Sequence, residues 1–516
     1  MAPSAADSTT DSIAAVTGDV DTQQRVLVRN LALANASSYL EYFFGLLVSM
    51  LIARSLGPEE YGTYVFLIWL ITIAVAFTNE GLSLSITKHV AERTKSSDIP
   101  HANKIITFFE RNHLGRIGIA TLPLIVAAFW SSQASHGYTF AAATAIALSL
   151  CFFMRARYML RISAFKGLEN FWGVALASFI VTPINLISAV TLFVLEAPLW
   201  SYLLQYVIVS LSFYLCTAFF LFRRVGYQQE PNYLAGNTDY FGRVTTYNRY
   251  ITPSAILTYL MASQTEIFFL RLFGGTEMVA FFSIGFVLAT AIAALVPGII
   301  NTILLPMISK SMSRGLDVVR GIVEDTLRYQ LYLNFLVIGP TILYADDLVV
   351  FLFTQEYVAA GRSFFWMALI YCGANFVSAF NSYLLASDEH KLILKVSIYG
   401  AIFGLICDLV LIYYYGLDGA IIALGLTMAW YVVTRIIPAN RKLKARLRWS
   451  HLAIVAVACA LCTFMADQAS AGFEGIAAAV VGSTLYVIAF TLCYYFSPVL
   501  PSSGRRYLKS RLAGAA

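Results

Sequence analysis

Residues 51–70 read LIARSLGPEEYGTYVFLIWL, and this stretch decides how the chain is organised. An apolar run ends near Ile52 and a second begins at Val65, and between them lie an arginine, the pair Gly57-Pro58 and two glutamates. Glycine and proline end helices and turn the chain. The pattern therefore predicts a hairpin between two apolar helices, with its polar tip in water.

The composition of the whole chain is typical of a membrane protein. The 516 residues are 59% hydrophobic and 12% charged, whereas an ordinary soluble domain has roughly 25% charged residues. Apolar runs of roughly 20 residues can cross the hydrocarbon core as helices. The candidate spans are 34–54, 61–84, 114–130, 138–157, 171–195, 200–222, 250–270, 278–304, 328–345, 363–385, 392–415, 417–437, 451–467 and 472–497. We therefore predict an all-α polytopic membrane protein with about 14 transmembrane helices, with 12 as the alternative.

The charges of the connections between spans predict the orientation. Lys and Arg in short loops stay cytoplasmic. If Arg25 and Arg29 lie inside, only Arg54, Arg271 and Arg362 of the 35 basic residues fall on the outer side. Both termini are therefore expected in the cytoplasm. The formal net charge of +6 reflects this inner-leaflet bias and does not indicate nucleic-acid binding.

The sequence shows no motif typical of a nucleotide-hydrolysing enzyme or of a metal site. The sequence has no G-x-x-x-x-G-K-[ST] loop, and its six histidines show no metal-ligand spacing. Cys459 and Cys462 form a C-x-x-C inside an apolar helix, where small residues pack. The longest outer loop, roughly 345–361, is short for a glycosyl polymerase or ligase. We expect no catalytic residues, no cofactor and no metal, and a transporter rather than an enzyme.

The opening motif is half of a weak internal repeat with an offset of 217 residues. The second copy, LRLFGGTEMVAF, covers residues 270–281. The identical pairs are Arg54 and Arg271, Gly57 and Gly274, Glu60 and Glu277, and Gly81 and Gly298. The offset equals six spans, an even number, so the copies have the same orientation. This predicts two six-helix lobes related by a pseudo-two-fold axis along the membrane normal, around a central cavity, plus two C-terminal helices.

The predicted organisation divides the chain into seven parts. The first 24 residues lack a basic start and an apolar core, so they are expected to be disordered rather than a signal peptide. Residues 101–113, in an inner loop, are expected to form an amphipathic helix lying in the headgroups. The parts are a cytoplasmic leader (1–24), an N-lobe (25–224), a cytoplasmic linker (225–249), a C-lobe (250–437), a basic loop (438–450), two further helices (451–497) and a basic cytoplasmic tail (498–516).

The chain resembles the polysaccharide transporters, or O-antigen-type oligosaccharide flippases, of the multidrug/oligosaccharidyl-lipid/polysaccharide exporter superfamily. The resemblance covers about residues 25–440. The motifs that carry it are LIARSLGPEEYGTYVFLIWL (51–70), NEGLSLSITK (79–88), LRLFGGTEMVAFFSIGFVLATAIAALVPGIINTILLPMISK (270–310), FLFTQEYVAAGRSFFWMALIYCGANFVSAFNSYLLASDEHK (351–391) and YYGLDGAIIALGLTMAW (414–430). The last two helices are less typical of members with twelve spans.

The resemblance implies a function. Members move undecaprenyl-diphosphate-linked oligosaccharides from the inner to the outer leaflet of the inner membrane, with two lobes rocking about a central cavity. It implies membrane lipid and the lipid-linked oligosaccharide as partners, with a polysaccharide polymerase and export proteins beside them. The glycan itself does not follow from short motifs.

Basic residues are the candidates for binding the diphosphate. Arg54 and Arg271 come first, although both could equally anchor the chain in the outer headgroups. Arg155 and Arg157 at the inner end of the fourth span follow, with ordinary positive-inside anchoring as their alternative. Two weaker candidates are Lys166 and Lys310.

Acidic residues inside spans are the candidates for cation or proton coupling, because an ionisable group in the membrane needs a partner or a wet cavity. Glu41 lies on a polar helix face, and Asn79 precedes Glu80 in an Asn-Glu-Gly sequence similar to the Glu-Gly of lipid II flippases. Glu266 and Asp408 lie in the seventh and eleventh spans. A structural hydrogen bond is the alternative for Glu41, and a local pair with Arg271 is the alternative for Glu266.

These features predict a flippase for lipid-linked oligosaccharide or polysaccharide repeat units that works by alternating access, driven by an ion gradient or the membrane potential. A small-molecule or multidrug antiporter of the same superfamily is the alternative. A membrane glycosyl polymerase or ligase is the alternative from another class.

Overall fold

The computed structural model describes residues 7–94, 99–225, 238–262, 264–295, 304, 307–387, 389–446 and 448–500. All regular secondary structure within these ranges is helical. The chain divides into two compact units. Each unit consists of two separate stretches of sequence. Unit 1 comprises Met1–Ile52 and Leu67–Ile256, and unit 2 comprises Ala53–Phe66 and Leu257–Ala516.

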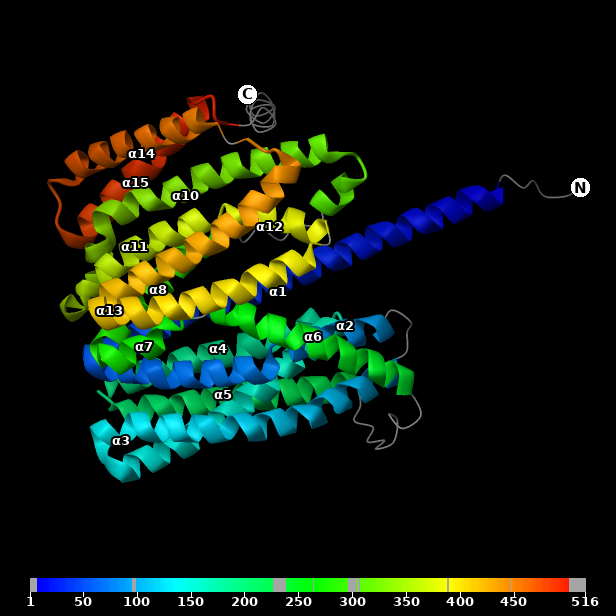
Figure 1. The fold of residues 1–516 in the computed structure, drawn as a ribbon, viewed down its shortest axis with the longest axis horizontal. Helices are drawn as coiled ribbons and strands as arrows, with labels where there is room; N and C mark the ends of the chain where they lie inside the picture. Colours follow the sequence, from blue (N-terminus) through cyan, green and yellow to red (C-terminus); the bar gives the residue numbers. More distant parts are fainter. Residues whose placement is uncertain are drawn as a thin grey trace, which may run out of the picture. The chain divides into compact units, whose positions relative to one another are not determined.

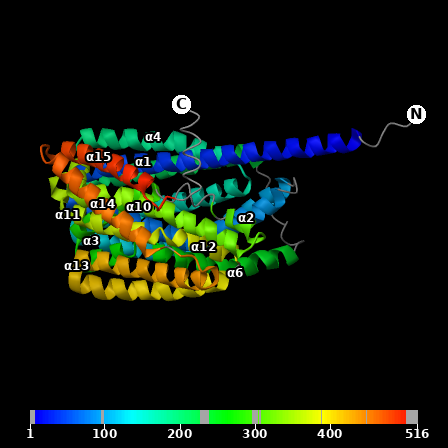
Figure 2. The ribbon, with the colours of Figure 1, turned by 90° about the horizontal axis from the view of Figure 1, so that it is seen from above.

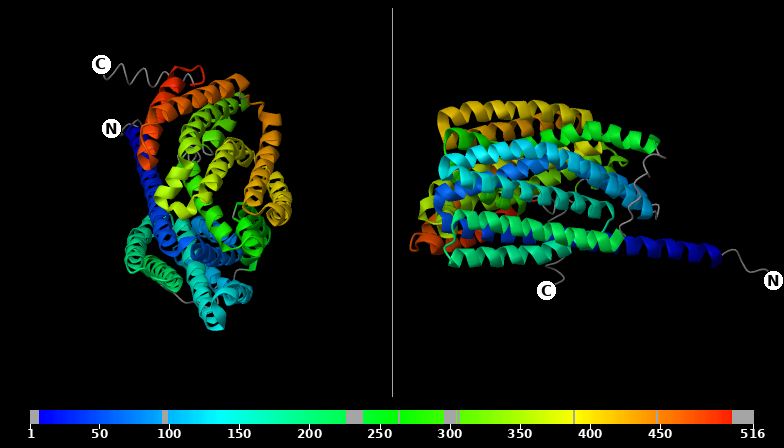
Figure 3. Two further views of the ribbon diagram at one scale, coloured as in Figure 1. Left: turned by 90° about the vertical axis from the view of Figure 1, so that its left-hand side faces the viewer. Right: turned by 90° about the horizontal axis from the view of Figure 1, so that it is seen from below.

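Unit 1 is a bundle of long helices. Its elements are α1 (Asp7–Asn79, apart from residues 53–66), α2 (Leu82–Thr94), α3 (Ile99–Gly167), α4 (Phe171–Val194), α5 (Leu199–Val225) and most of α6 (Thr238–Ala262). Helix α3 packs against α2 and α5, and α4 packs against α5 (Figures 1 and 3). Phe109 and Phe165, on the two arms of α3, are fully buried in an apolar cluster with residues of α2 and α5.

Unit 2 contains shorter and more interrupted helices. Its elements are α7 (Glu266–Phe273), α8 (Thr276–Leu295), α10 (Leu316–Leu352), the 3₁₀ turn η2 (Gln355–Tyr357), α11 (Ala359–Ala374), α12 (Val377–Ala386), α13 (His390–Leu443), α14 (Trp449–Ser470) and α15 (Gly475–Phe496). Helix α8 packs against α11, and α7 packs against α13. The yellow and orange arms of α13 run side by side in Figure 2.

Glycines in the left-handed region of backbone conformation turn the chain where the sequence predicts hairpins. Gly57 has φ 70°, Gly137 has φ 81° and Gly416 has φ 55°, and each interrupts one of the long helices α1, α3 and α13. Gly275, between α7 and α8, has φ 91°. Only glycine adopts such angles without a Cβ clash. The predicted turns at Gly57-Pro58 and Gly274-Gly275 are therefore confirmed.

Eleven helices in the described part of the chain are long and apolar enough to cross a membrane. Two of them, Leu40–Asn79 and Lys391–Leu443, contain a turn glycine and cover two predicted spans each. The predicted span 250–270 falls on the separate helices α6 and α7. The chain is thus a multi-pass helical membrane protein, and the count of fourteen stays a prediction.

Several expected boundaries differ in the structure. Helix α1 begins at Asp7, so residues 7–24 are helical where a disordered leader was expected. A helix satisfies its own backbone hydrogen bonds, and extending an existing helix avoids the nucleation cost. Residues 101–113 form the start of the long helix α3 rather than a separate interfacial helix. Helix α13 continues to Leu443 into the expected basic loop. The linker residues 226–237 and the tail residues 501–516 lie outside the described residues.

The two C-terminal helices pack against α10, and tyrosine side chains contact glycines at this interface. A Cβ on Gly339 would lie 2.0 Å from the Tyr486 ring, and a Cβ on Gly482 would lie 1.8 Å from the Tyr344 hydroxyl. The Tyr486 hydroxyl donates to the Phe335 carbonyl at 2.7 Å. Since both glycines permit close approach of a ring, α14 and α15 form one packing unit with α10 (Figure 1).

Candidate functional site

Two buried carboxyl groups meet in unit 2. Glu266 is the first residue of α7, and Asp408 lies in the first arm of α13, which packs against α7. Glu266 is 5% exposed and Asp408 is 1% exposed. Both line the same small cavity, so the structure brings together two residues that the sequence singled out separately. We call them the acid pair.

The cavity that the acid pair lines is small, and two threonines line it as well. Its volume is about 10 Å³, near the lower limit for one bound water or small ion. The Thr265 hydroxyl donates to Asp408 Oδ2 at 2.8 Å. Thr427, on the second arm of α13, also lines the cavity, and Gly404 leaves room for it, because a Cβ there would lie 3.2 Å from Thr427 Oγ1.

Two oxygen atoms of the acid pair are unsatisfied. Glu266 Oε2 and Asp408 Oδ1 are buried and have no hydrogen-bond partner among the described residues. Two carboxylates that share a buried site repel each other, which disfavours charging both. A proton or a cation between them would remove that repulsion. Within the described residues, no group of three or more His, Cys, Asp and Glu side chains is arranged to hold a metal ion.

Arg54 belongs to unit 2 and caps the end of a helix there. Its Nε donates to the Leu352 carbonyl at 2.8 Å, and its Nη2 donates to the Phe351 carbonyl. These are terminal carbonyls of α10, which have no partner within their own helix. The Tyr357 hydroxyl donates to the Ala53 carbonyl at 2.8 Å. The described contacts of Arg54 are therefore those of a helix cap.

The two copies of the repeated motif pack against each other within unit 2. A Cβ on Gly62 would lie 1.8 Å from the Thr276 carbonyl oxygen, so only glycine allows this approach. The Arg271 guanidinium lies 6.0 Å from the centroid of the Phe66 ring. The two copies of the motif, in residues 53–66 and in α7–α8, therefore contact each other directly.

The other basic candidates lie in different surroundings. The Arg155 guanidinium lies 4.7 Å from the Tyr206 ring and 5.5 Å from the Tyr158 ring. Arg157 is 8% exposed and pairs with Glu110, with 3.1 Å between Nη2 and Oε2. The side chains of Lys166, in the last turn of α3, and Lys310 are exposed.

The acidic and amide candidates of unit 1 make local contacts. Glu41 accepts a hydrogen bond from the Ser178 hydroxyl on α4, which is the structural alternative expected for it. Asn79 is buried, and its Nδ2 donates to the Ala156 carbonyl at 2.8 Å. His113 Nε2 lies 2.9 Å from Asn79 Oδ1. Glu80, directly after α1, is half-buried.

Sequence reasoning missed several buried charged residues. Glu110 pairs with Arg161 as well as with Arg157, at 2.9 Å from Oε1 to the Arg161 Nε. We call these three residues the paired cluster. Arg435 is 3% exposed, lies 3.9 Å over the Tyr431 ring and donates to Ser397. The cost of an ionisable group inside a span was the signal available for Arg435, whereas Glu110 lay in a segment expected at the interface.

A family whose proteins are described as polysaccharide biosynthesis proteins matches residues 51–361. No curated protein sequence matches the chain significantly. A structure of the lipid II flippase MurJ in an inward closed conformation is similar with a TM-score of 0.68 and 10% identity, over 90% of this chain and 99% of that chain.

MATE family transporters share the fold as well. An inward-facing multidrug resistance MATE family transporter of the MOP superfamily has a TM-score of 0.64 and 13% identity, over 79% of this chain and 95% of that chain. A MOP superfamily transporter from Pyrococcus furiosus has a TM-score of 0.56 and 13% identity, over 81% of this chain and 96% of that chain. The predicted all-α polytopic fold of this superfamily is therefore confirmed.

Proposed function

This chain belongs to the polysaccharide biosynthesis protein family, and we propose that it is a flippase that moves undecaprenyl-diphosphate-linked oligosaccharide or polysaccharide repeat units across the inner membrane. The family match and a transporter fold over 90% of the chain support a translocation step within polysaccharide synthesis. The termini lie in the cytoplasm in this proposal, and a polysaccharide polymerase and export proteins act on the translocated product.

The acid pair is the observation that carries the mechanism. A translocating protein that alternates between two access states needs a second species whose binding differs between the states. Glu266 and Asp408 each have one unsatisfied buried oxygen, and both residues line a cavity of about 10 Å³ together with Thr265 and Thr427. We propose that one sodium-like cation or one proton binds here and drives the cycle.

Binding of the diphosphate requires cationic groups. Arg54 donates hydrogen bonds to two carbonyls at the end of α10, and Arg157 is paired with Glu110. Arg271 and Arg155 lie over aromatic rings, and we keep all four arginines as candidate diphosphate ligands, with Lys166 and Lys310 as weaker ones. Glu41, Glu80 and Asn79 are kept as candidate cavity residues.

The test is translocation of a fluorescent undecaprenyl-diphosphate oligosaccharide in proteoliposomes. We expect wild-type protein to move the lipid when a sodium or proton gradient is imposed, and Arg271→Gln to lower the rate at least about tenfold, as loss of one charge-assisted contact predicts. Arg54→Gln is the matched variant on the other copy of the repeat, and it should lower stability more than rate. Absence of lipid translocation under either gradient would contradict the proposal.

A small-molecule antiporter is the second candidate, because a MATE family transporter shares the fold over 79% of this chain. Gradient-driven efflux of an organic cation from the same proteoliposomes, without lipid translocation, would favour it. In that case neutralising the acid pair should abolish efflux, and Arg271→Gln should leave it unchanged.

A further inference from the structure

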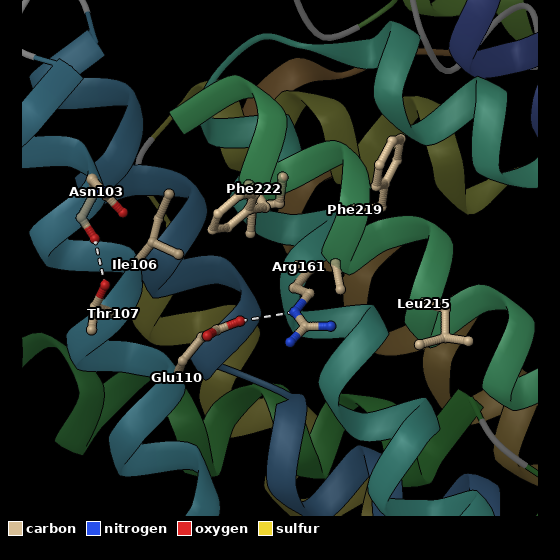
Figure 4. Close-up of a pocket in the computed structure, with 10 residues that line it drawn as sticks. Asn103, Ile106, Thr107, Glu110, Arg161, Leu215, Phe219 and Phe222 are labelled. Carbon is tan, nitrogen blue, oxygen red and sulfur yellow. Dashed lines mark hydrogen bonds and ion pairs between the residues drawn. The ribbon is translucent and has the colours of Figure 1, made fainter. Parts of the chain in front are cut away.

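The residues that line a pocket in unit 1 include neither the acid pair nor the candidate substrate ligands Arg271 and Arg155. It has a volume of about 430 Å³ and lies between the two arms of α3 and the end of α5. Figure 4 shows Arg161 and Glu110 at its base, with Phe219 and Phe222 of α5 across from them. The pocket is thus largely apolar and has one charged pair inside.

The apolar wall of the pocket continues onto the outside of the bundle. Leu215, Phe219 and Phe222 are 54%, 55% and 62% exposed. In a bundle that crosses a membrane, such side chains meet lipid rather than water. An occupant therefore has an apolar part that enters from the bilayer, which free phosphate lacks.

The charged pair at the base of the pocket belongs to a cluster with excess positive charge, because Arg157, which does not line the pocket, also contacts Glu110. Two arginines, Arg157 and Arg161, share the single carboxylate of Glu110. Arg161 donates from Nε to Glu110 and from Nη1 to the Tyr214 carbonyl at 3.2 Å, and its guanidinium lies 4.6 Å from the centroid of the Tyr214 ring. Its Nη2 has no acceptor among the described residues. A buried charge without a full counter-charge favours binding of an anion.

The rim of the pocket adds a further basic group. Arg223, at the end of α5, is exposed, and its guanidinium lies 5.4 Å from the Phe219 ring centroid. Its loop is one that the charge pattern predicts to be cytoplasmic. Basic pockets between membrane helices on that side of a membrane suit the phosphate groups of anionic lipids.

We propose that this pocket binds one anionic phospholipid of the cytoplasmic leaflet, with its phosphate at Arg161 and an acyl chain along the apolar wall of α5. The lipid balances the charge of the paired cluster and fills the space between α3 and α5. It is a resident of unit 1 and is not the translocated cargo.

The test measures lipid binding to the delipidated full-length protein in detergent by native mass spectrometry. Phosphatidylglycerol and phosphatidylcholine with identical chains are the probes, and inorganic phosphate is the third. We expect one phosphatidylglycerol per chain, bound at least about tenfold more tightly than phosphatidylcholine, as a charge-assisted contact predicts. Equal binding of the two lipids would overturn the proposal.

Two variants separate the pocket from general lipid binding. Ala218→Phe fills the pocket without changing any charge and should weaken phosphatidylglycerol binding at least about tenfold. Leu211→Phe, about two turns away on the same helix and outside the pocket, should bind like wild type. Equal binding by both variants would show that the lipid lies elsewhere.

Two competitors distinguish other sources of the anion. Inorganic phosphate that displaces phosphatidylglycerol at similar concentration would make this a free-anion site and overturn the lipid assignment. Undecaprenyl phosphate that displaces it at a lower concentration would assign the pocket to the cargo and overturn the proposal equally. Failure of both to compete supports a resident phospholipid, and this result does not depend on flippase activity.

Discussion

Each unit buries a small group of charges, and the two groups are built on opposite principles. In unit 1, Glu110 is held between Arg157 and Arg161 at 3.1 and 2.9 Å. In unit 2, Glu266 and Asp408 line a shared cavity, and the Thr265 hydroxyl donates a hydrogen bond to Asp408. The first group pairs opposite charges, whereas the second brings two carboxyl groups together and leaves an oxygen of each unsatisfied.

We interpret the paired cluster as a structural group and the acid pair as a group that can bind and release a cation. A paired buried charge holds helices together, because removing one partner leaves the other uncompensated. A pair of like charges gains from any cation that enters and can lose it again. In the proposed mechanism, unit 2 therefore carries the coupling step, and the charges of unit 1 keep its helices in place.

The largest effect is expected when the carboxylate of the paired cluster is removed, which tests whether this cluster stabilises unit 1. Glu110→Gln leaves two buried arginines without a counter-charge, so we expect a loss of about 3–5 kcal/mol of unfolding free energy. Chemical or thermal unfolding of the purified protein in detergent measures it. Glu196→Gln, which changes an exposed acid of the same unit, is the matched control. Unchanged stability of Glu110→Gln would remove the distinction between the two groups.

The opposite result is expected for the acid pair. The double variant Glu266→Gln with Asp408→Asn removes repulsion between buried groups, so stability should stay within about 1 kcal/mol of wild type or rise. Cation-driven translocation in proteoliposomes should fall at least about 100-fold, equivalent to about 2.7 kcal/mol. A variant that unfolds while the remaining protein transports normally would assign the acid pair to structure instead.

The effect of added cation on stability tests the acid pair without any change in unit 1. If sodium binds the acid pair, a concentration ten times its dissociation constant stabilises wild-type protein by about 1.4 kcal/mol. Thermal unfolding in sodium chloride against choline chloride at equal ionic strength measures it. The Glu266 and Asp408 double variant should lose this difference, and Glu110→Gln should keep it. A difference retained by the double variant would place the sodium site elsewhere.

The smallest expected effect concerns the hydroxyl beside Asp408. Thr265→Val removes one hydrogen bond to the carboxylate, which should change the apparent cation affinity about fivefold, or about 1 kcal/mol. The cation dependence of translocation rate measures this. Thr290→Val is the matched control, because the Thr290 hydroxyl bonds the Phe286 carbonyl of its own helix. Equal affinities in the two variants would exclude Thr265 from the site.

The helices and turns followed from the sequence because they depend on local signals. Apolar runs predicted the spans, and Gly57 and Gly275 predicted turns that require positive φ. Glu266 and Asp408 stood out because an acid in an apolar run is expensive. Their meeting could not be predicted, since a helix that is apolar on most sides does not reveal which face meets a neighbour.

Long-range contacts were also outside the reach of sequence patterns. Arg54 resembled a headgroup anchor or a cavity residue, but its described partners are carbonyls of residues 351 and 352. Glu110 lay in a segment that read as amphipathic, because its pairing with arginines about 50 positions later left no local trace. Such contacts depend on how helices rotate and pack, and a single sequence does not determine that.

Residues 53–66 belong to unit 2, so during synthesis their native partners are made long after they are. Ala53 bonds Tyr357, 304 positions later in the chain. At about 5–20 residues per second, this first turn waits about 15–60 s after its own synthesis for its partner to be made. During that interval the Ala53 carbonyl and the Arg54 side chain lack their native contacts. Unit 2 therefore cannot be completed in order from one end, and the early hairpin must remain available in the membrane until the later helices arrive.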